Sequence, residues 1–147
     1  MSNFFTRDFF KNIFTKKQNE ETRATPTGGT IASWIDDILS ISIPDTVTAF
    51  CFNLYEESDG SWAMELVGTE RFDLEDEDWA CDELTDFGSR EHPYTWEMDS
   101  SWNEAFAYVA DELQRYLESG KNAHVLKSRA GVGVGFADGD IEILFAK

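Results

Sequence analysis

The most regular pattern of apolar and polar positions lies in residues 101–120, SWNEAFAYVADELQRYLESG. Ser101 and Glu104 have the spacing of a capping box, and Gly120 stands where helices commonly end in the left-handed conformation. The pattern predicts one long amphipathic helix whose apolar face packs on a sheet. Apolar residues recur at spacings of three and four, the period of one helix face, at Trp102, Phe106, Val109, Leu113, Tyr116 and Leu117.

Strand-like segments lie on both sides of this helix. Residues 46–57 are rich in β-branched and aromatic residues, and residues 62–72 return after the turn sequence Asp59-Gly60. Residues 131–137 and 140–146 flank a second such turn, Asp138-Gly139. Two hairpins are therefore expected. In the first, each strand has one apolar face, made of Phe50, Phe52 and Leu54 and of Trp62, Met64 and Leu66.

Glycine alternates with apolar residues in the second hairpin, at Gly131, Gly133 and Gly135. No helix is predicted directly after these glycines, as a phosphate-binding loop would require. A strand face lined with glycine instead lets another backbone approach closely, and the helix at 101–120 is one candidate.

An earlier helix is predicted at 31–42, where Ile31, Trp34, Ile35, Ile38 and Leu39 share one face and Pro44 follows. The expected fold is α+β in the order α-β-β-α-β-β. A mainly antiparallel sheet made of the two hairpins carries helices packed on one face. We assign residues 30–147 to this single acidic domain.

Residues 1–29 differ from that domain. Residues 1–17 interleave aromatic residues with Arg7, Lys11, Lys16 and Lys17, and residues 18–29 are polar and punctuated by Pro26 and two glycines, as linkers are. Residues 1–17 carry +3 and residues 18–23 carry −1, so the −17 of the whole chain leaves −19 on residues 24–147. The basic segment could make weak contact with a membrane surface, fold back on the acidic body or dock on a partner.

The large negative charge bears on partner choice. Direct binding of nucleic acid is disfavoured, because it depends on Lys and Arg displacing counterions from phosphates. A basic protein partner fits the sign of the charge. So does imitation of nucleic acid, or an acidic scaffold that blocks a DNA-binding protein.

The negative charge is densest in residues 70–86, where nine carboxylates stand against Arg71 alone. We expect this block to be ordered because apolar residues interrupt it. The prediction is that its carboxylates attract a basic partner and that a partly exposed Trp79 fills a pocket on it. In the alternative, Trp79 with Leu74 and Leu84 pins an acidic loop to the body. The candidate partner-binding residues are Asp73, Glu75, Asp76, Glu77, Asp78, Trp79, Asp82 and Glu83.

The sequence contains no paired nucleophile and base, no metal-ligand spacing and no cofactor loop, so no catalytic residue, metal or cofactor is predicted and an enzyme is disfavoured. Cys51 lies in a strand-like run and is expected to be a buried structural thiol; with Cys81 it makes no disulfide framework. No apolar stretch reaches membrane-spanning length and no signal peptide is evident, so a cytoplasmic location is expected.

Three stretches carry a family resemblance: DEDWACDEL at 76–84, the helix at 100–120, and VGVGFADGDIEIL at 132–144. They resemble small acidic immunity proteins of bacterial toxin systems, in particular α+β families encoded beside polymorphic toxins. The resemblance covers residues 30–147. It implies a cytoplasmic protein that neutralises a cognate toxin by covering it. With the acidic charge, our first hypothesis is a stoichiometric inhibitor of a basic, nuclease-type toxin. Such proteins share no functional motif, so the resemblance assigns no residue. The oligomeric state stays open.

Overall fold

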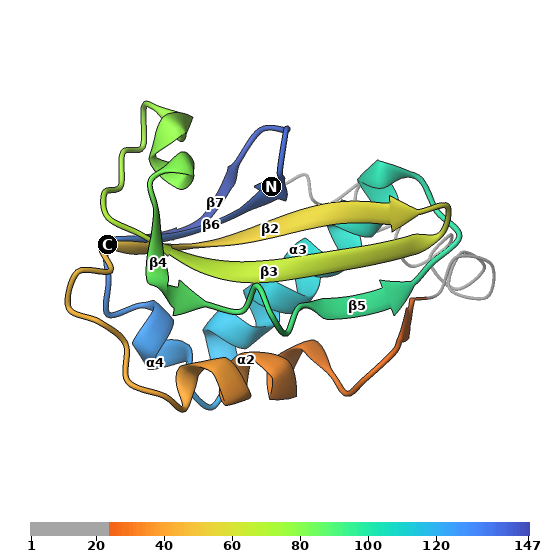
Figure 1. The fold of residues 1–147 in the computed structure, drawn as a ribbon, viewed down its shortest axis with the longest axis horizontal. Helices are drawn as coiled ribbons and strands as arrows, with labels where there is room; N and C mark the ends of the chain where they lie inside the picture. The colour runs from red at the N-terminus through yellow and green to blue at the C-terminus, as the bar shows by residue number, and fades with distance from the viewer. Residues whose placement is uncertain (1–23) are drawn as a thin grey trace, which may run out of the picture.

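The computed structural model describes residues 24–147, which form a mixed α+β fold around one seven-stranded sheet (Figure 1). Its helices are α2 (Ile31–Leu39), α3 (Trp102–Ser119), α4 (Ala123–Leu126) and the short 3₁₀-helix η1 (Glu77–Cys81). Its strands are β1 (Thr25–Pro26), β2 (Ala49–Ser58), β3 (Ser61–Thr69), β4 (Glu83–Gly88), β5 (Tyr94–Glu97), β6 (Gly131–Phe136) and β7 (Glu142–Ala146). The basic segment 1–17 and its expected contacts lie outside the described residues.

Both predicted hairpins are present and antiparallel, β2 with β3 and β6 with β7. The φ of Gly60 is +82°, a value that glycine adopts readily, in agreement with the predicted turn at Asp59-Gly60. The sheet is mainly antiparallel, as expected, but the two hairpins do not form it alone, since β1, β4 and β5 also belong to it. The hairpins join through a parallel pair, because β2 and β6 pair in parallel from Ala49↔Gly131 to Leu54↔Phe136. The main path of the sheet runs β1-β5-β3-β2-β6-β7, and β4 also pairs with β3.

Four elements were not predicted: β1, β4, β5 and α4. Strands β4 and β5 both pair with β3 on the side away from β2 and extend the sheet there. The sequence does carry a period-two signal for β5, because the apolar residues Tyr94, Trp96 and Met98 alternate with polar ones. In the structure these three are buried and their neighbours are exposed or half-buried. Strand β1 pairs Thr25 with Glu97, so the end of the predicted linker lies along the sheet.

The helices α2, α3 and α4 cover one face of the sheet, whereas η1 and the β6–β7 turn rise from the other (Figure 1). The main core forms on the helix side, and the predicted strand faces of β2 and β3 are confirmed as part of it. Helix α3 contributes Ala105, Val109, Leu113, Tyr116 and Leu117.

Two details of the predicted long helix are wrong. Trp102 is 53% exposed, because the first turn of α3 lies at the rim, where the indole stacks on Phe136 instead of entering the core. Phe106 is half-buried and packs against the main core, as its place on the apolar face predicts. Gly120 has φ −67° rather than a left-handed value; glycine fits there because the ring of Tyr116 occupies the space a side chain would need. The predicted capping box at Ser101 and Glu104 is confirmed.

Candidate functional site: an acidic ledge on the second face of the sheet

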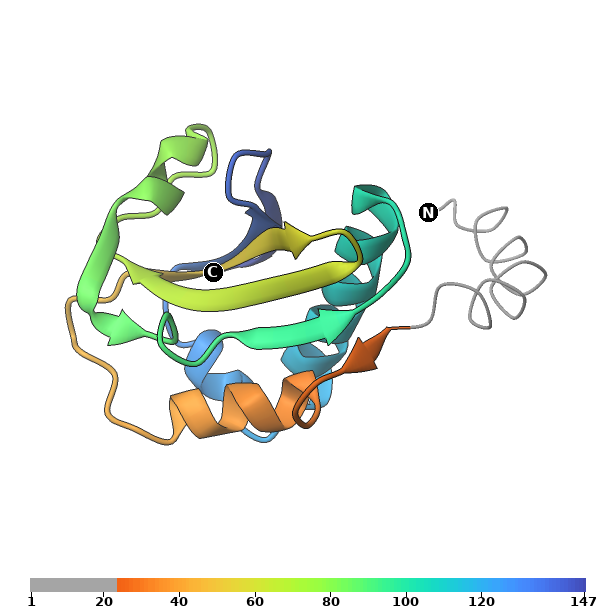
Figure 2. The same ribbon diagram turned by 45° about the vertical axis from the view of Figure 1, so that its right-hand side comes forward.

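The predicted partner-binding residues lie on a projection that we call the acidic ledge, residues 70–83 between β3 and β4 (Figure 2). Its two ends meet at the sheet. The amide of Glu70 donates to the carbonyl of Asp82 at 2.9 Å, and Thr69 pairs with Glu83 across β3 and β4. The ledge is therefore closed at its base and projects from the face opposite the helices.

Carboxylates of the ledge order its backbone. Asp73 Oδ1 accepts a hydrogen bond from the amide of Glu75 at 2.8 Å, and Asp76 Oδ1 accepts one from the amide of Asp78 at 3.0 Å. Asp76 is the N-cap residue of η1, so the second bond satisfies an amide that the helix start leaves free. These turns leave the side chains from Glu75 to Asp78 exposed.

Trp79 is 1% exposed, so the expectation that its indole is partly exposed is wrong. Its ring packs edge-to-face on Phe72, with 4.8 Å between ring centroids. Together with Ala49, Cys51 and Val67 it forms a small second core, against which Ile141 and Ile143 also pack. Trp79 therefore attaches the ledge to the sheet. The exposed apolar residue of the ledge is Leu74, at 63%.

The glycines of β6 make room for these aromatic rings. A Cβ at Gly131 would collide with the ring of Phe72, and one at Gly133 would lie 3.0 Å from Trp79 Cζ2. Helix α3 covers the opposite face, so it is not the element that the glycines admit. Close approach of a backbone is confirmed at Gly135, where a Cβ would collide with the carbonyl oxygen of Asp140.

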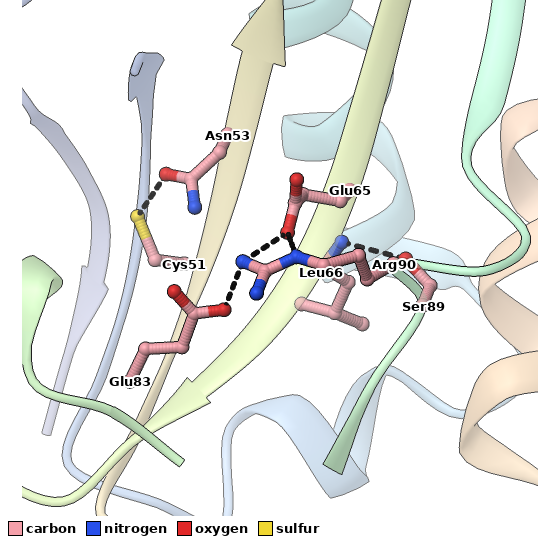
Figure 3. Close-up of polar contacts among 7 residues, drawn as sticks. All are labelled: Cys51, Asn53, Glu65, Leu66, Glu83, Ser89 and Arg90. Atoms are coloured by element: carbon pink, nitrogen blue, oxygen red, sulfur yellow. Dashed lines mark hydrogen bonds and ion pairs between the residues drawn. The ribbon is translucent and has the colours of Figure 1, made fainter. Parts of the chain in front are cut away.

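Two arginines neutralise part of the ledge. Arg71 pairs with Asp82 and lies 3.8 Å from Asp76. Arg90, which follows β4, pairs with Glu83 and bonds the largely buried Glu65 at 2.9 and 3.1 Å (Figure 3). The bond to Glu65 raises the pKa of Arg90.

Glu65 and Arg90 were missed by the sequence reasoning. Glu65 sits inside an apolar strand, which is the one signal that could have singled it out, because a buried carboxylate needs a cation. Beside this pair, the hydroxyl of Ser89 accepts a hydrogen bond from the amide of Leu66 at 2.8 Å (Figure 3). These contacts attach the chain after β4 to the sheet.

The structure separates the eight predicted residues. Trp79 lies in the second core, and Asp76 and Asp82 face Arg71. Asp73 and Glu75 border a cleft of about 530 Å³ that Arg129 and Lys147 also line. Glu77, Asp78 and Glu83 border another, of about 450 Å³, over the sheet surface; its other walls are Asn53, Tyr55, Ala80, Cys81, Ala137, Asp138, Gly139 and Ile141.

Cys51 lies beneath the ledge and is a buried thiol, as expected. Burial, with smaller effects of Cys81 and Glu83, raises the pKa of Cys51 to about 12, so the thiol is protonated at neutral pH. It donates a hydrogen bond to Asn53 Oδ1 at 3.4 Å (Figure 3). A protonated, enclosed thiol is a poor nucleophile.

Within residues 24–147, no group of three His, Cys, Asp or Glu residues is arranged to hold a metal ion. No helix in the same range is both long enough and apolar enough to cross a membrane. No protein family, curated protein or solved structure matches this chain. The candidate site therefore rests on its own geometry and charge.

Proposed function

We propose that this protein neutralises a positively charged protein partner by stoichiometric binding. Following the resemblance to immunity proteins, the partner is a cognate bacterial toxin of the nuclease type. The observation that supports the proposal most directly is the uncompensated charge of the ledge. Among the described residues, no Lys or Arg pairs with Glu75, Glu77 or Asp78, and all three side chains are exposed.

The construction of the ledge suits such a role. Trp79 and the Arg90 pair hold the ledge to the sheet, so the free carboxylates sit on a fixed support before any partner arrives. A binding surface that is ordered in advance loses less conformational entropy on association. Exposed like charges also accelerate encounter with a basic surface over roughly a Debye length, about 8 Å at physiological salt.

The test measures binding kinetics between this protein and the product of the neighbouring gene. In the variant Glu75→Lys/Glu77→Lys/Asp78→Lys we expect the association rate constant to fall by about 10-fold or more and its salt dependence to flatten, because steering is lost. The matched control reverses three exposed carboxylates away from the ledge, in Asp37→Lys/Glu91→Lys/Glu118→Lys.

An association rate lowered only in the ledge variant supports the proposal. If the parent protein and both variants associate at equal rates, the interface lies elsewhere. If the association rate constant falls equally in both variants, the effect comes from net charge and not from the ledge. A toxin assay at increasing molar ratio gives the second readout. Activity should reach its minimum at one-to-one stoichiometry with the parent protein and persist at that ratio with the ledge variant.

A further inference from the structure

A second tryptophan among carboxylates lies away from the ledge, at the start of α3. The rings of Trp102 and Phe136 stack with 4.5 Å between centroids and 27° between planes, and we call this pair the Trp102 platform. Trp102 Nε1 donates to Glu56 Oε1 at 2.6 Å. More than half of the Trp102 side chain faces solvent, although a large aromatic surface is costly to leave in water.

Three stretches of chain meet at the platform. The amide of Met98 donates to the carbonyl of Gly60 at 2.9 Å, which joins the end of β5 to the β2–β3 turn. The amide of Ala137 donates to the carbonyl of Leu54 at 3.1 Å, which joins the end of β6 to β2. The bond between Trp102 and Glu56 joins the start of α3 to β2.

These stretches are uniformly acidic. Residues 53–62, 95–104 and 135–142 contain nine carboxylates and no Lys or Arg. The ledge, by comparison, carries Arg71 and is paired with Arg90. Trp102 thus lies among acidic stretches: Glu56 bonds its indole, and Glu104 follows it by two residues in the first turn of α3. The other carboxylates of these stretches are Glu57, Asp59, Glu97, Asp99, Asp138, Asp140 and Glu142.

The described chain begins at this same end. Thr25 pairs with Glu97, and Glu97 precedes Trp102 by five residues, which span at most about 18 Å even when fully extended. The seven residues from 18 to 24 can span up to roughly 25 Å. Residue 17 is therefore within reach of the platform.

We propose that residues 1–17 dock on the Trp102 platform of their own chain. Their composition complements it: five phenylalanines and an isoleucine match the exposed rings, and four cations match the carboxylates of the neighbouring stretches. Arginine and lysine also bind the faces of indole rings. The phenylalanines and isoleucine are Phe4, Phe5, Phe9, Phe10, Ile13 and Phe14, and the cations are Arg7, Lys11, Lys16 and Lys17.

The tether makes this contact effective even if each interaction is weak, because a short linker holds the segment at about millimolar effective concentration. Docking covers the exposed indole at the start of α3, which lies at the other end of the sheet from η1 (Figure 2). The chain would then present one acidic surface to partners and cover the other itself. This inference does not depend on the proposed function.

The test follows the accessibility of Trp102 in the full-length chain by acrylamide quenching. The contribution of Trp102 is obtained by difference from the matching Trp102→Phe protein. The variant Lys11→Glu/Lys16→Glu removes the charge complementarity, and Phe9→Ser/Phe10→Ser removes apolar contact without changing charge. The control Lys121→Glu/Lys127→Glu changes net charge equally at the far end of α3.

We expect both segment variants to raise the quenching of Trp102 about 2-fold relative to the parent and the control. About 1 M salt should raise the quenching of the parent in the same way, because it shortens the Debye length to about 3 Å. Equal quenching in all proteins would overturn the proposal. Protection that disappears on dilution would assign the contact to a second copy, and protection seen only with anionic vesicles would assign the segment to a membrane surface.

Discussion

Trp79 and Trp102 are both flanked by carboxylates in the sequence, yet one is 1% exposed and the other 53%. Trp79 reaches the second face of the sheet, where Gly131 and Gly133 leave space for Phe72 and the indole. Trp102 begins a helix at the rim of the sheet, where Phe136 can cover only one face of its ring.

The difference shows that local composition does not decide the role of an aromatic residue among acids. In the ledge the tryptophan is a structural anchor, whereas Glu77 and Asp78 beside it are exposed. At the start of α3 the tryptophan itself is the accessible group. Three sets of substitutions, taken from the largest expected effect to the smallest, test this contrast.

Removing each indole should separate the two roles most clearly. Trp79→Ala should lower the free energy of unfolding by about 3–5 kcal/mol, because it empties the second core. Trp102→Ala should cost about 1 kcal/mol or less, since its ring is half in solvent already. Chemical denaturation of both variants measures the difference. Similar losses would mean that Trp79 is no more anchored than Trp102.

A larger residue in β6 should displace Trp79 from the second core while leaving the tryptophan itself unchanged. Gly133→Val should cost about 1–3 kcal/mol by overpacking, because even a Cβ there lies 2.8 Å from Ile141 and 3.0 Å from Trp79. We expect a red shift of tryptophan emission as Trp79 becomes wetter. Gly28→Val is the matched control, since a Cβ at Gly28 meets nothing within 4 Å. An unchanged emission spectrum in Gly133→Val would contradict this account of the glycines.

The compensated and uncompensated carboxylates should respond differently to loss of charge. Arg90→Met leaves the buried Glu65 without its cation, so it should lower the free energy of unfolding by about 1 kcal/mol. The expected loss is small because the Arg90 side chain is largely exposed to solvent. Adding Glu65→Gln should recover part of that loss in a double-mutant cycle. Asp138→Asn, at the platform end, should change stability by less than about 0.5 kcal/mol. If the effects of Arg90→Met and Glu65→Gln on the free energy of unfolding simply add in the double variant, Arg90 does not stabilise Glu65.

Much of the fold follows from local pattern. The spacing of Val109, Leu113 and Leu117 places them on one face of α3, and the alternation through Phe50, Phe52 and Leu54 orients β2 towards the core. The start of α3 and the turn at Gly60 depend on interactions within a few residues, which a sequence displays directly. The parallel pairing of β2 with β6 depends on residues some eighty positions apart and has no such signal.

The acidic composition of residues 70–86, the helix at 101–120 and the two hairpins were determined by the sequence itself, because each is a property of neighbouring residues. Which tryptophan is buried was decided only by the tertiary structure. Burial depends on what surface the fold brings opposite a side chain: a glycine-lined strand opposite Trp79, and a single phenylalanine at the rim of the sheet opposite Trp102. Arg90 likewise meets Glu65 from twenty-five residues away only because β3 and β4 pair.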